Sequence, residues 1–215
     1  LANAVIISTG ASAKWLGLAD ENRLNGQGVS ACAVCDGFFF KGQDVAVVGA
    51  GDTAAEEASY LSKLANKVYM IVRRNEMRAS KIMQQRIFSA ENIEILWNTE
   101  TEKLIGEHQL ERIIVSNNKT KEKKVINVTG FFVAIGHKPN TEIFDSILDL
   151  DDSGYIITIP GSSKTKIPGI FATGDAQDRI YRQAVTAAGR GCMGALDAER
   201  FLAEKELELA QVPQK

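Results

Sequence analysis

The chain has 215 residues, of which 45% are hydrophobic and 24% are charged, and its formal net charge is −2. This composition is typical of a soluble globular protein with a sizeable core. Basic residues are scattered apart from one short cluster at 119–124, no apolar run reaches the roughly 18 residues of a membrane span, and three cysteines are too few for a disulfide scaffold. We therefore expect no nucleic-acid partner, no membrane anchoring and a cytoplasmic location.

The first ten residues form an apolar, strand-like run that leads directly into Gly10 without an initiator methionine. Such a run is typical of a buried strand that ends in a glycine turn. We therefore expect the sequence to be a piece cut from within a longer protein.

Cys32 and Cys35 lie in a Cys-x-x-Cys-Asp motif, a spacing at which two cysteines can close a small disulfide ring. A helix that begins beneath them would stabilise the thiolate of the nearer cysteine through its N-terminal dipole. The alternative is half a zinc site. The third cysteine, Cys192, lies far away in an apolar helical pattern, and no second Cys-x-x-Cys completes four ligands. The motif therefore favours an exchangeable disulfide, with no metal.

A strand, a glycine turn and a helix follow. Residues 44–48 are a β-branched run, residues 53–64 carry an apolar helical stripe, and residues 68–72 are predicted to be the next strand. In a Gly-x-Gly-x-x-Ala turn the glycines permit a tight turn and the close approach of a pyrophosphate, which meets the helix N-terminus. An ordinary strand-to-helix turn is the alternative. The candidate phosphate-binding residues are Gly49, Gly51, Asp52, Thr53 and Ala54.

Arginines stand where the second strand of this unit ends. An NAD site has an acidic residue there for the ribose hydroxyls, whereas this chain has Arg73 and Arg74, with Arg78 one turn further on. Guanidinium groups suit a 2′-phosphate because of their forked donors. The pocket is therefore predicted to prefer NADPH over NADH, the alternative being a solvated basic face.

The middle of the chain is predicted to contain an antiparallel meander. After a helical stretch at 79–90 come four short strand-like runs, at 93–96, 103–105, 113–115 and 124–128. The middle ones are predicted to form the meander, with hairpin turns at the polar and glycine-containing breaks 106–109 and 116–122. The basic cluster at 119–124 is then a hairpin tip. His108, in another break, is predicted to be a surface residue rather than a ligand or a base.

Two further strands are predicted. Residues 131–136 are a continuous apolar run of the buried-strand type, and a domain boundary can follow it. Residues 170–175 form a strand that ends in Gly174 and Asp175, and a long helix follows from about 181 to 204. Asp175 is a candidate for holding a ribose or ribityl hydroxyl, and a helix cap and turn is an equally good interpretation.

Several of these motifs in series resemble the low-molecular-weight NADPH-dependent thioredoxin reductases. The resemblance runs from Leu1 to about Ala203 and matches the C-terminal two thirds of that family, without its N-terminal FAD-binding segment. The matching stretches are Cys32-Ala33-Val34-Cys35-Asp36-Gly37-Phe38-Phe39, Gly49-Ala50-Gly51-Asp52-Thr53-Ala54, Arg73-Arg74 with Arg78-Ala79, Ala134-Ile135-Gly136-His137, and Gly174-Asp175 with Tyr181-Arg182-Gln183-Ala184.

The resemblance implies an α/β fold with two parts. One is a Rossmann-like, three-layer NADPH-binding domain with an antiparallel β-meander, at residues 11–136. The other is a split FAD-binding domain, to which residues 1–10 and 137–215 contribute. Loops around Gly10 and His137 would be the hinges between them.

The resemblance also implies roles for individual residues. Cys35 resembles the cysteine that faces the flavin, Cys32 the one that attacks the partner's disulfide, and Asp36 the acid that shuttles their proton. The other positions it marks as cofactor-binding are Ile135, Gly136, Gly174, Asp175, Arg182, Gln183 and Ala184.

The implied activity passes electrons from NADPH through FAD and the Cys32–Cys35 disulfide to thioredoxin or another small dithiol protein, in a homodimer. Two departures from the family are visible: Val72 stands where a histidine is frequent, and Ala50 where a glycine is frequent. We expect neither to remove the NADPH preference. The alternatives are a relative that serves a peroxiredoxin-type partner and an NADPH-binding fragment without turnover.

Overall fold

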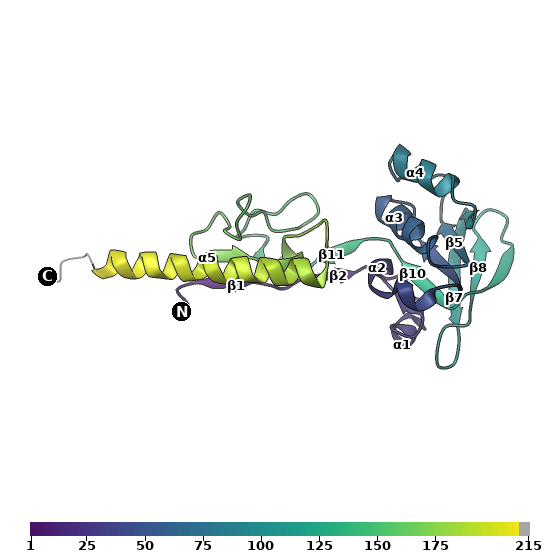
Figure 1. The fold of residues 1–215 in the computed structure, drawn as a ribbon, viewed down its shortest axis with the longest axis horizontal. Coiled ribbons are helices and arrows are strands. Elements are labelled where there is room, and N and C mark those ends of the chain that lie inside the picture. The colour runs from purple at the N-terminus through teal and green to yellow at the C-terminus, as the bar shows by residue number, and fades with distance from the viewer. Residues whose placement is uncertain (211–215) are drawn as a thin grey trace. The chain divides into compact units, whose positions relative to one another are not determined.

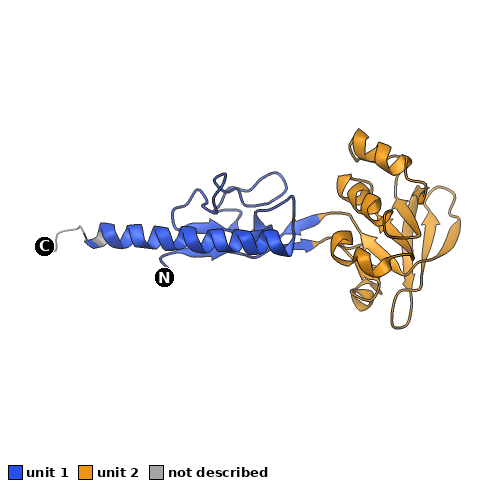
Figure 2. Ribbon diagram, viewed as in Figure 1, with its two compact units in different colours: residues 1–12, 137–215 blue, residues 13–136 orange. Residues whose placement is uncertain are grey.

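The structure is a computed structural model that describes residues 1–210, and the chain divides into two compact units (Figure 2). Unit 1 comprises residues 1–12 together with the chain from residue 137 onward, and unit 2 comprises residues 13–136. The boundaries expected from the sequence lay after residues 10 and 136.

Unit 2 is built on a five-stranded sheet in which every neighbouring pair is parallel. Two of its strands surround the glycine turn: β4 (Asp44–Val48) precedes α3 (Asp52–Leu61), and β5 (Lys67–Val72) follows it. The sheet order is β3-β10-β4-β5-β6, with β3 at Val29–Ser30, β10 at Gly130–Val133 and β6 at Ile93–Trp97.

The sheet lies between a helical layer and a second, antiparallel sheet (Figure 1). Because side chains alternate along a strand, Val45 and Val47 pack among buried residues of α3 and α4 (Lys81–Phe88), while Ala46 and Val48 pack against the antiparallel sheet. That sheet has the order β7-β8-β9, with β7 at Thr99–Ile105, β8 at Arg112–Asn117 and β9 at Lys123–Asn127. The predicted three-layer α/β fold with a β-meander is thereby confirmed.

Some predicted elements of unit 2 are confirmed and others differ. The strand expected at 93–96 is present as part of β6 in the parallel sheet, and the runs expected for the meander lie in β7 and β8. The strand expected at 131–136 ends at Val133, and the chain turns at Gly136, whose φ is 101°. Short elements between residues 21 and 40 were not predicted, because none is long enough to show a periodic pattern: α1 (Glu21–Leu24), β3, α2 (Ala33–Asp36) and the 3₁₀ helix η1 (Gly37–Phe40).

Unit 1 contains a parallel strand pair and one long helix. Strand β1 (Val5–Ile7) pairs with β12 (Ile170–Ala172), and α5 (Ala184–Ala210) packs against both. A second pair joins β2 (Ala11–Ala13), whose last residue is the first of unit 2, to β11 (His137–Pro139). Unit 1 also contains two 3₁₀ turns, η2 (Glu142–Phe144) and η3 (Gly174–Ala176). No helix in residues 1–210 combines the length and apolar character needed to cross a bilayer.

Helix α5 begins three residues later than predicted. Arg182 has a φ of 47°, outside the helical region, and the Asp178 carboxylate accepts hydrogen bonds from the backbone N–H groups of Ile180 and Tyr181. This carboxylate-stabilised turn delays the start of the helix to Ala184. Further along α5, Asp197 accepts hydrogen bonds from Ser163, which fix the helix to the loop that precedes β12 and lower the pKa of the Asp197 carboxyl group.

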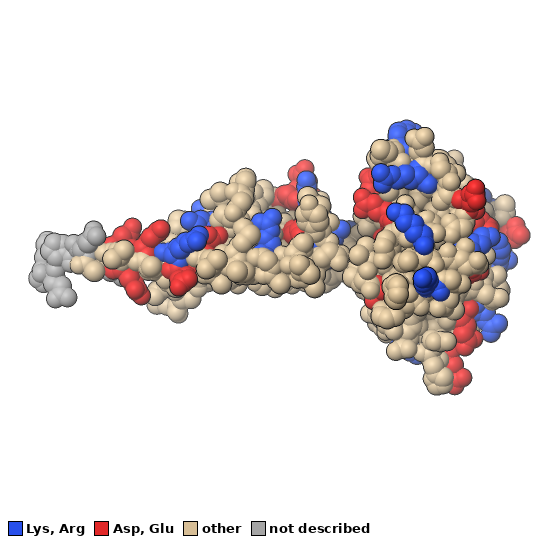
Figure 3. All heavy atoms as spheres, viewed as in Figure 1, with Lys and Arg blue, Asp and Glu red and all other residues tan. Residues whose placement is uncertain are grey.

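The face of unit 2 drawn in Figure 3 carries lysine and arginine side chains interspersed with aspartate and glutamate. A mixed surface of this kind produces no extended field of one sign. Charge on this face therefore does not single out a partner, and the site has to be found from local geometry.

Candidate functional site

The Cys-x-x-Cys motif of unit 2 forms a disulfide. Cys32 and Cys35 are bonded, with their Cα atoms 5.3 Å apart, which confirms the disulfide predicted for the pair. Cys32 is the N-cap of α2, and the backbone N–H of Cys35 points at Cys32 Sγ at 3.2 Å. A donor in this position favours negative charge on Cys32 Sγ once the disulfide opens. The helix beneath the pair has only four residues, and η1 continues from it.

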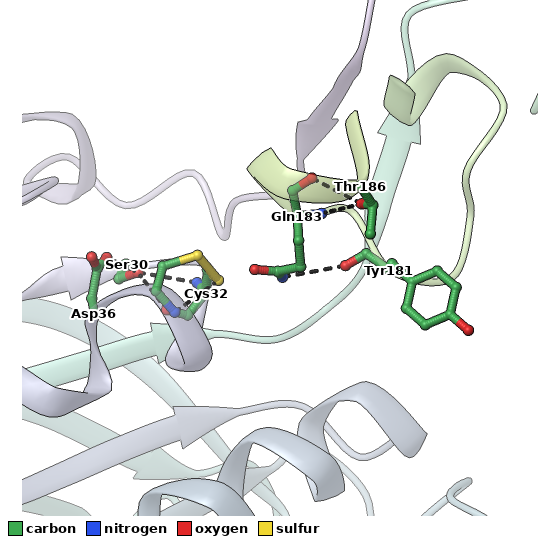
Figure 4. The surroundings of a disulfide bond; sticks show 7 residues. Ser30, Cys32, Asp36, Tyr181, Gln183 and Thr186 are labelled. Atoms are coloured by element: carbon green, nitrogen blue, oxygen red, sulfur yellow. Dashed lines mark hydrogen bonds between the residues drawn. A yellow bond between two sulfur atoms is a disulfide. The ribbon is translucent and has the colours of Figure 1, made fainter. Parts of the chain in front are cut away.

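Asp36 lies beside this disulfide, and a buried serine holds its carboxylate (Figure 4). Ser30 Oγ donates to Asp36 Oδ2 at 2.6 Å and accepts from the backbone N–H of Cys32 at 3.0 Å. The Ser30 residue is only 6% exposed. The predicted acid is therefore tied through one hydroxyl to the backbone of the first cysteine.

The segment that carries the disulfide also exposes large apolar side chains. Phe38 and Phe39 in η1 are 67% and 74% exposed, and Val34 in α2, between the two cysteines, is exposed as well. We call these three residues the apolar rim. Neighbouring exposed apolar groups of this size are typical of surfaces that bind another molecule.

A cavity of about 460 Å³ lies within unit 2, at the carboxyl ends of its parallel strands. Ligands of open α/β sheets bind at this end of the strands. Five residues predicted for the nucleotide line it together: Gly49, Arg73, Arg74, Arg78 and Ile135. The remaining wall includes Leu16, Leu18 and residues 99–101, none of which was predicted to belong to the site.

The glycine turn at the start of α3 has one crowded and one open position. A Cβ atom on Gly49 would lie 2.4 Å from Ala134 O and 2.7 Å from Ala54 Cβ, and φ at Gly49 is 145°, so only glycine fits. A Cβ on Gly51 would meet no atom within 4 Å. The turn therefore packs tightly on the sheet at Gly49 and leaves free space at Gly51, the N-cap of α3.

The helical residues of the motif have separate tasks. The side chain of Ala54 is fully buried against the turn, so it serves packing. Asp52, the first residue of α3, accepts a hydrogen bond from the backbone N–H of Ser80 at 2.8 Å, and hydrogen bonds from Ser80 lower the pKa of the Asp52 carboxyl. Asp52 thus ties the start of α3 to the segment that follows the arginines, while Thr53 lies half-buried next to it.

The three arginines that line the cavity are all exposed. Arg73 Nε lies 4.0 Å from Glu100 Oε1, a loose ion pair that leaves most of the guanidinium free to bind a ligand. The backbone N–H of Arg78 donates to Ala50 O at 2.7 Å, which connects the arginine loop to the glycine turn. Positive charge and free donors therefore lie next to a helix N-terminus, an arrangement that suits a phosphorylated nucleotide.

The remaining predicted site residues lie in unit 1. Asp175 is in η3, so the turn that was one interpretation of Gly174 and Asp175 is present. Its Oδ1 is buried and has no hydrogen-bond partner among residues 1–210. Burial, and less strongly the charge of Asp178, raise the pKa of Asp175. Arg182 and Gln183 precede α5, and Ala184 is its first residue.

Comparison with known proteins identifies the family. A family model described as pyridine nucleotide-disulphide oxidoreductase matches residues 1–191. The chain belongs to this family. It is 54% identical over 207 residues to a thioredoxin reductase of Debaryomyces hansenii, covering 95% of this chain and 64% of the relative, and 50% identical over 204 residues to one of Rickettsia conorii, covering 94% and 66%.

Solved structures of thioredoxin reductases are also similar to this chain. The thioredoxin reductase from Giardia duodenalis superimposes with a TM-score of 0.88 at 42% identity, over 94% of this chain and 67% of that one. One from Streptococcus pyogenes gives 0.89 at 38% identity, over 94% and 66%. This pyridine nucleotide-disulphide oxidoreductase chain thus spans about two thirds of the length of the relatives that it matches.

Three residues that support the oxidoreductase site were not predicted. Asn118 Nδ2 donates to Arg73 O at 2.8 Å, and the backbone N–H of Asn98 donates to Arg74 O at 3.0 Å, so the meander fixes the arginine loop. Glu21 is 3% exposed, and its carboxylate accepts the backbone N–H groups of residues 16–18, which include two cavity residues. These contacts join residues distant in sequence or lie in an aperiodic loop, and no motif signals them.

The two glycines of the turn give a matched test of this geometry. We expect Gly49→Ala to destabilise unit 2 by roughly 2 to 5 kcal/mol, because the added methyl group overlaps backbone atoms at a positive φ. Gly51→Ala should change stability by less than about 1 kcal/mol, because its φ is −91° and the space around it is open. The measurement is urea denaturation followed by tryptophan fluorescence, since Trp15 and Trp97, the two tryptophans of the chain, both lie in unit 2.

Equal loss of stability in the two variants would contradict the crowding inferred at Gly49. A Gly42→Ala variant controls for backbone conformation, because Gly42 also has a positive φ, 73°, and has open space around it. Gly42→Ala should lower the free energy of unfolding by less than Gly49→Ala does.

Proposed function

We propose that this chain is the greater part of an NADPH-dependent thioredoxin-disulfide reductase, which passes electrons from NADPH through FAD to the Cys32–Cys35 disulfide and on to thioredoxin or another small dithiol protein. One observation carries the proposal: unit 2 combines a disulfide with a cavity lined by a glycine turn and three arginines. The names of the relatives support the same activity. We further propose that the complete enzyme is a homodimer in the cytoplasm.

Unit 2 is proposed as the NADPH-binding domain. The open space at Gly51, together with the start of α3 at Asp52 and Thr53, suits the pyrophosphate. Arg73, Arg74 and Arg78 suit the 2′-phosphate, which would pair with guanidinium donors where an acidic residue would repel it. Ile135 and Gly136 are the last two residues of unit 2. They are assigned to the part of the nucleotide beyond the pyrophosphate, away from the 2′-phosphate.

Unit 1 is proposed to supply part of the FAD site, through Gly174, Asp175, Arg182, Gln183 and Ala184. The unpartnered Oδ1 of Asp175 supports this assignment, because a buried carboxylate oxygen requires a donor and a sugar or ribityl hydroxyl is one. FAD, when bound, would take a hydride from NADPH and deliver the electron pair to a disulfide.

Thiol exchange is assigned to residues of this chain. With the pair reduced, the Cys32 thiolate attacks the partner's disulfide, forming a mixed disulfide and expelling one partner sulfur as a thiolate. Cys35 then attacks Cys32 Sγ, which re-forms the Cys32–Cys35 bond and releases the partner as a dithiol. Two electrons pass to the partner, and Asp36 accepts and returns the proton. The apolar rim gives such a partner a surface to contact.

The proposed cycle requires two arrangements of the enzyme. One cysteine pair cannot meet the flavin and a partner's disulfide at the same time, so we assign it alternately to each, through rotation of one unit against the other. The segments around Gly10 and His137 are the proposed hinges. Their position in the sequence, near the unit boundaries after residues 12 and 136, supports this assignment.

The arginines predict a preference for the 2′-phosphate. The chain should bind 2′,5′-ADP more tightly than ADP, and Arg74→Ala should weaken 2′,5′-ADP binding about 10- to 100-fold while it leaves ADP binding almost unchanged, because it removes charge-assisted hydrogen bonds to the 2′-phosphate alone. Isothermal titration calorimetry measures both ligands. Arg112→Ala in β8 is the matched control. Equal affinity of the wild type for the two ligands would contradict the proposed NADPH preference.

The different roles proposed for the two cysteines predict which variant forms a stable mixed disulfide with a partner. With Cys192 replaced by serine, since this free cysteine is exposed, the reduced Cys35→Ser variant should accumulate a mixed disulfide with oxidised thioredoxin, because no thiol remains to resolve it. The reduced Cys32→Ser variant should form little. Non-reducing electrophoresis and intact mass measure the adduct.

Equal trapping by both variants would contradict the role of Cys32, and trapping by neither would contradict thiol exchange with this partner. In the complete enzyme loaded with FAD, Cys32→Ser should abolish NADPH-driven reduction of thioredoxin. An unchanged rate there would overturn the proposed function.

A further inference from the structure

We propose that Ser30 is a positioning residue of the exchange site: its hydroxyl group holds the Asp36 carboxyl in the orientation from which that group exchanges a proton with the cysteine pair. The inference rests on the proposed function, in which Asp36 is the acid. It adds a residue that acts through Asp36, to which its hydroxyl group is hydrogen-bonded.

The Ser30 hydroxyl connects the acid to the first cysteine by two directed hydrogen bonds (Figure 4). It accepts from the backbone N–H of Cys32 at 3.0 Å and has one proton to give. Two acceptors are within reach, Asp36 Oδ2 at 2.6 Å and Cys32 O at 3.4 Å. The short bond to the carboxylate is the stronger, because a charged acceptor strengthens a hydrogen bond.

Ser30 itself is held firmly by the sheet. It is the last residue of β3, which runs parallel to β10 with Ser30 paired to Phe132, and it is 6% exposed. Asp36 lies at the end of α2 and is half-buried, so its side chain has room to turn toward solvent. The rigid serine therefore limits the orientations of a carboxyl group that would otherwise be mobile.

The exchange step shows why orientation matters. When an external thiolate attacks the disulfide, one sulfur–sulfur bond forms, the Cys32–Cys35 bond breaks, and the expelled sulfur takes up a proton. A dithiol reagent thus loses two electrons and two protons, and the cysteine pair gains both. Asp36 can supply a proton to the leaving sulfur and recover one from the reagent's second thiol as that thiol attacks, and proton transfer requires a well-placed acid. Ser30 is not consumed.

The test follows reduction of the disulfide by excess dithiothreitol, which needs neither NADPH nor FAD. The chain of residues 1–215 with Cys192→Ser is quenched at successive times with an alkylating agent, and intact mass counts the alkylated thiols. We compare Ser30→Ala, Asp36→Asn and the double variant, with Ser59→Ala in α3 as the control for loss of a half-buried hydroxyl.

We expect Ser30→Ala and Asp36→Asn each to slow reduction about tenfold or more, and the double variant to be no slower than Asp36→Asn alone, because Ser30 acts only through Asp36. Ser30→Thr should restore the rate, since threonine keeps the hydroxyl. If Ser30→Ala does not fold, Ser30→Thr and Ser30→Val provide the comparison, because they share one shape and differ in the hydroxyl.

Four results would overturn the inference. If Ser30→Ala is reduced at the normal rate while Asp36→Asn is reduced slowly, Asp36 keeps its role as the acid and Ser30 has no part in the mechanism. Additive losses in the double variant, or equal rates for Ser30→Thr and Ser30→Val, reduce Ser30 to a structural role. A normal rate in Asp36→Asn overturns the role of Asp36 in the proposed function, and the role of Ser30 with it.

Discussion

Parallel pairing of five strands is the constraint on which the rest of unit 2 depends. In a parallel sheet all the carboxyl ends lie along one edge, so the segments that follow the strands are brought together however far apart they are in the sequence. The disulfide follows β3, the glycine turn follows β4 and the arginines follow β5. Residues 99–101 come soon after β6, and Ile135 follows β10. The arginine-lined cavity and the disulfide therefore lie at the same edge of the sheet.

Two packing layers keep this edge in place. The pleat of β4 sends alternate side chains into the helical layer and into the meander, so both faces of the sheet are covered. The meander also acts on the site directly, because Asn98 and Asn118 hold the backbone of the arginine loop. Gly49 shows how close the packing is, since a single added methyl group would overlap the carbonyl of Ala134.

Features with a local signal were predictable from the sequence. Each of three signals lies within one short stretch of the sequence: the β-branched run before Gly49, the helical stripe after it and the arginines after β5. In the structure, Gly49, Arg73 and Arg74 line one cavity. Features set by tertiary contacts were not predictable. Ser30 lies in a two-residue strand, Glu21 caps a loop without a motif, and the start of α5 depends on the turn at Asp178.

The proposed nucleotide site is the one most directly open to experiment, because every residue that lines the cavity belongs to unit 2. A crystal structure of the chain with NADP⁺ is the decisive measurement. We expect the 2′-phosphate within hydrogen-bond distance of the guanidinium groups of Arg73 and Arg74, and the pyrophosphate beside Gly51 at the start of α3. A nucleotide bound elsewhere, or one whose 2′-phosphate points into solvent away from the arginines, would contradict the assignment of unit 2 as the NADPH-binding domain.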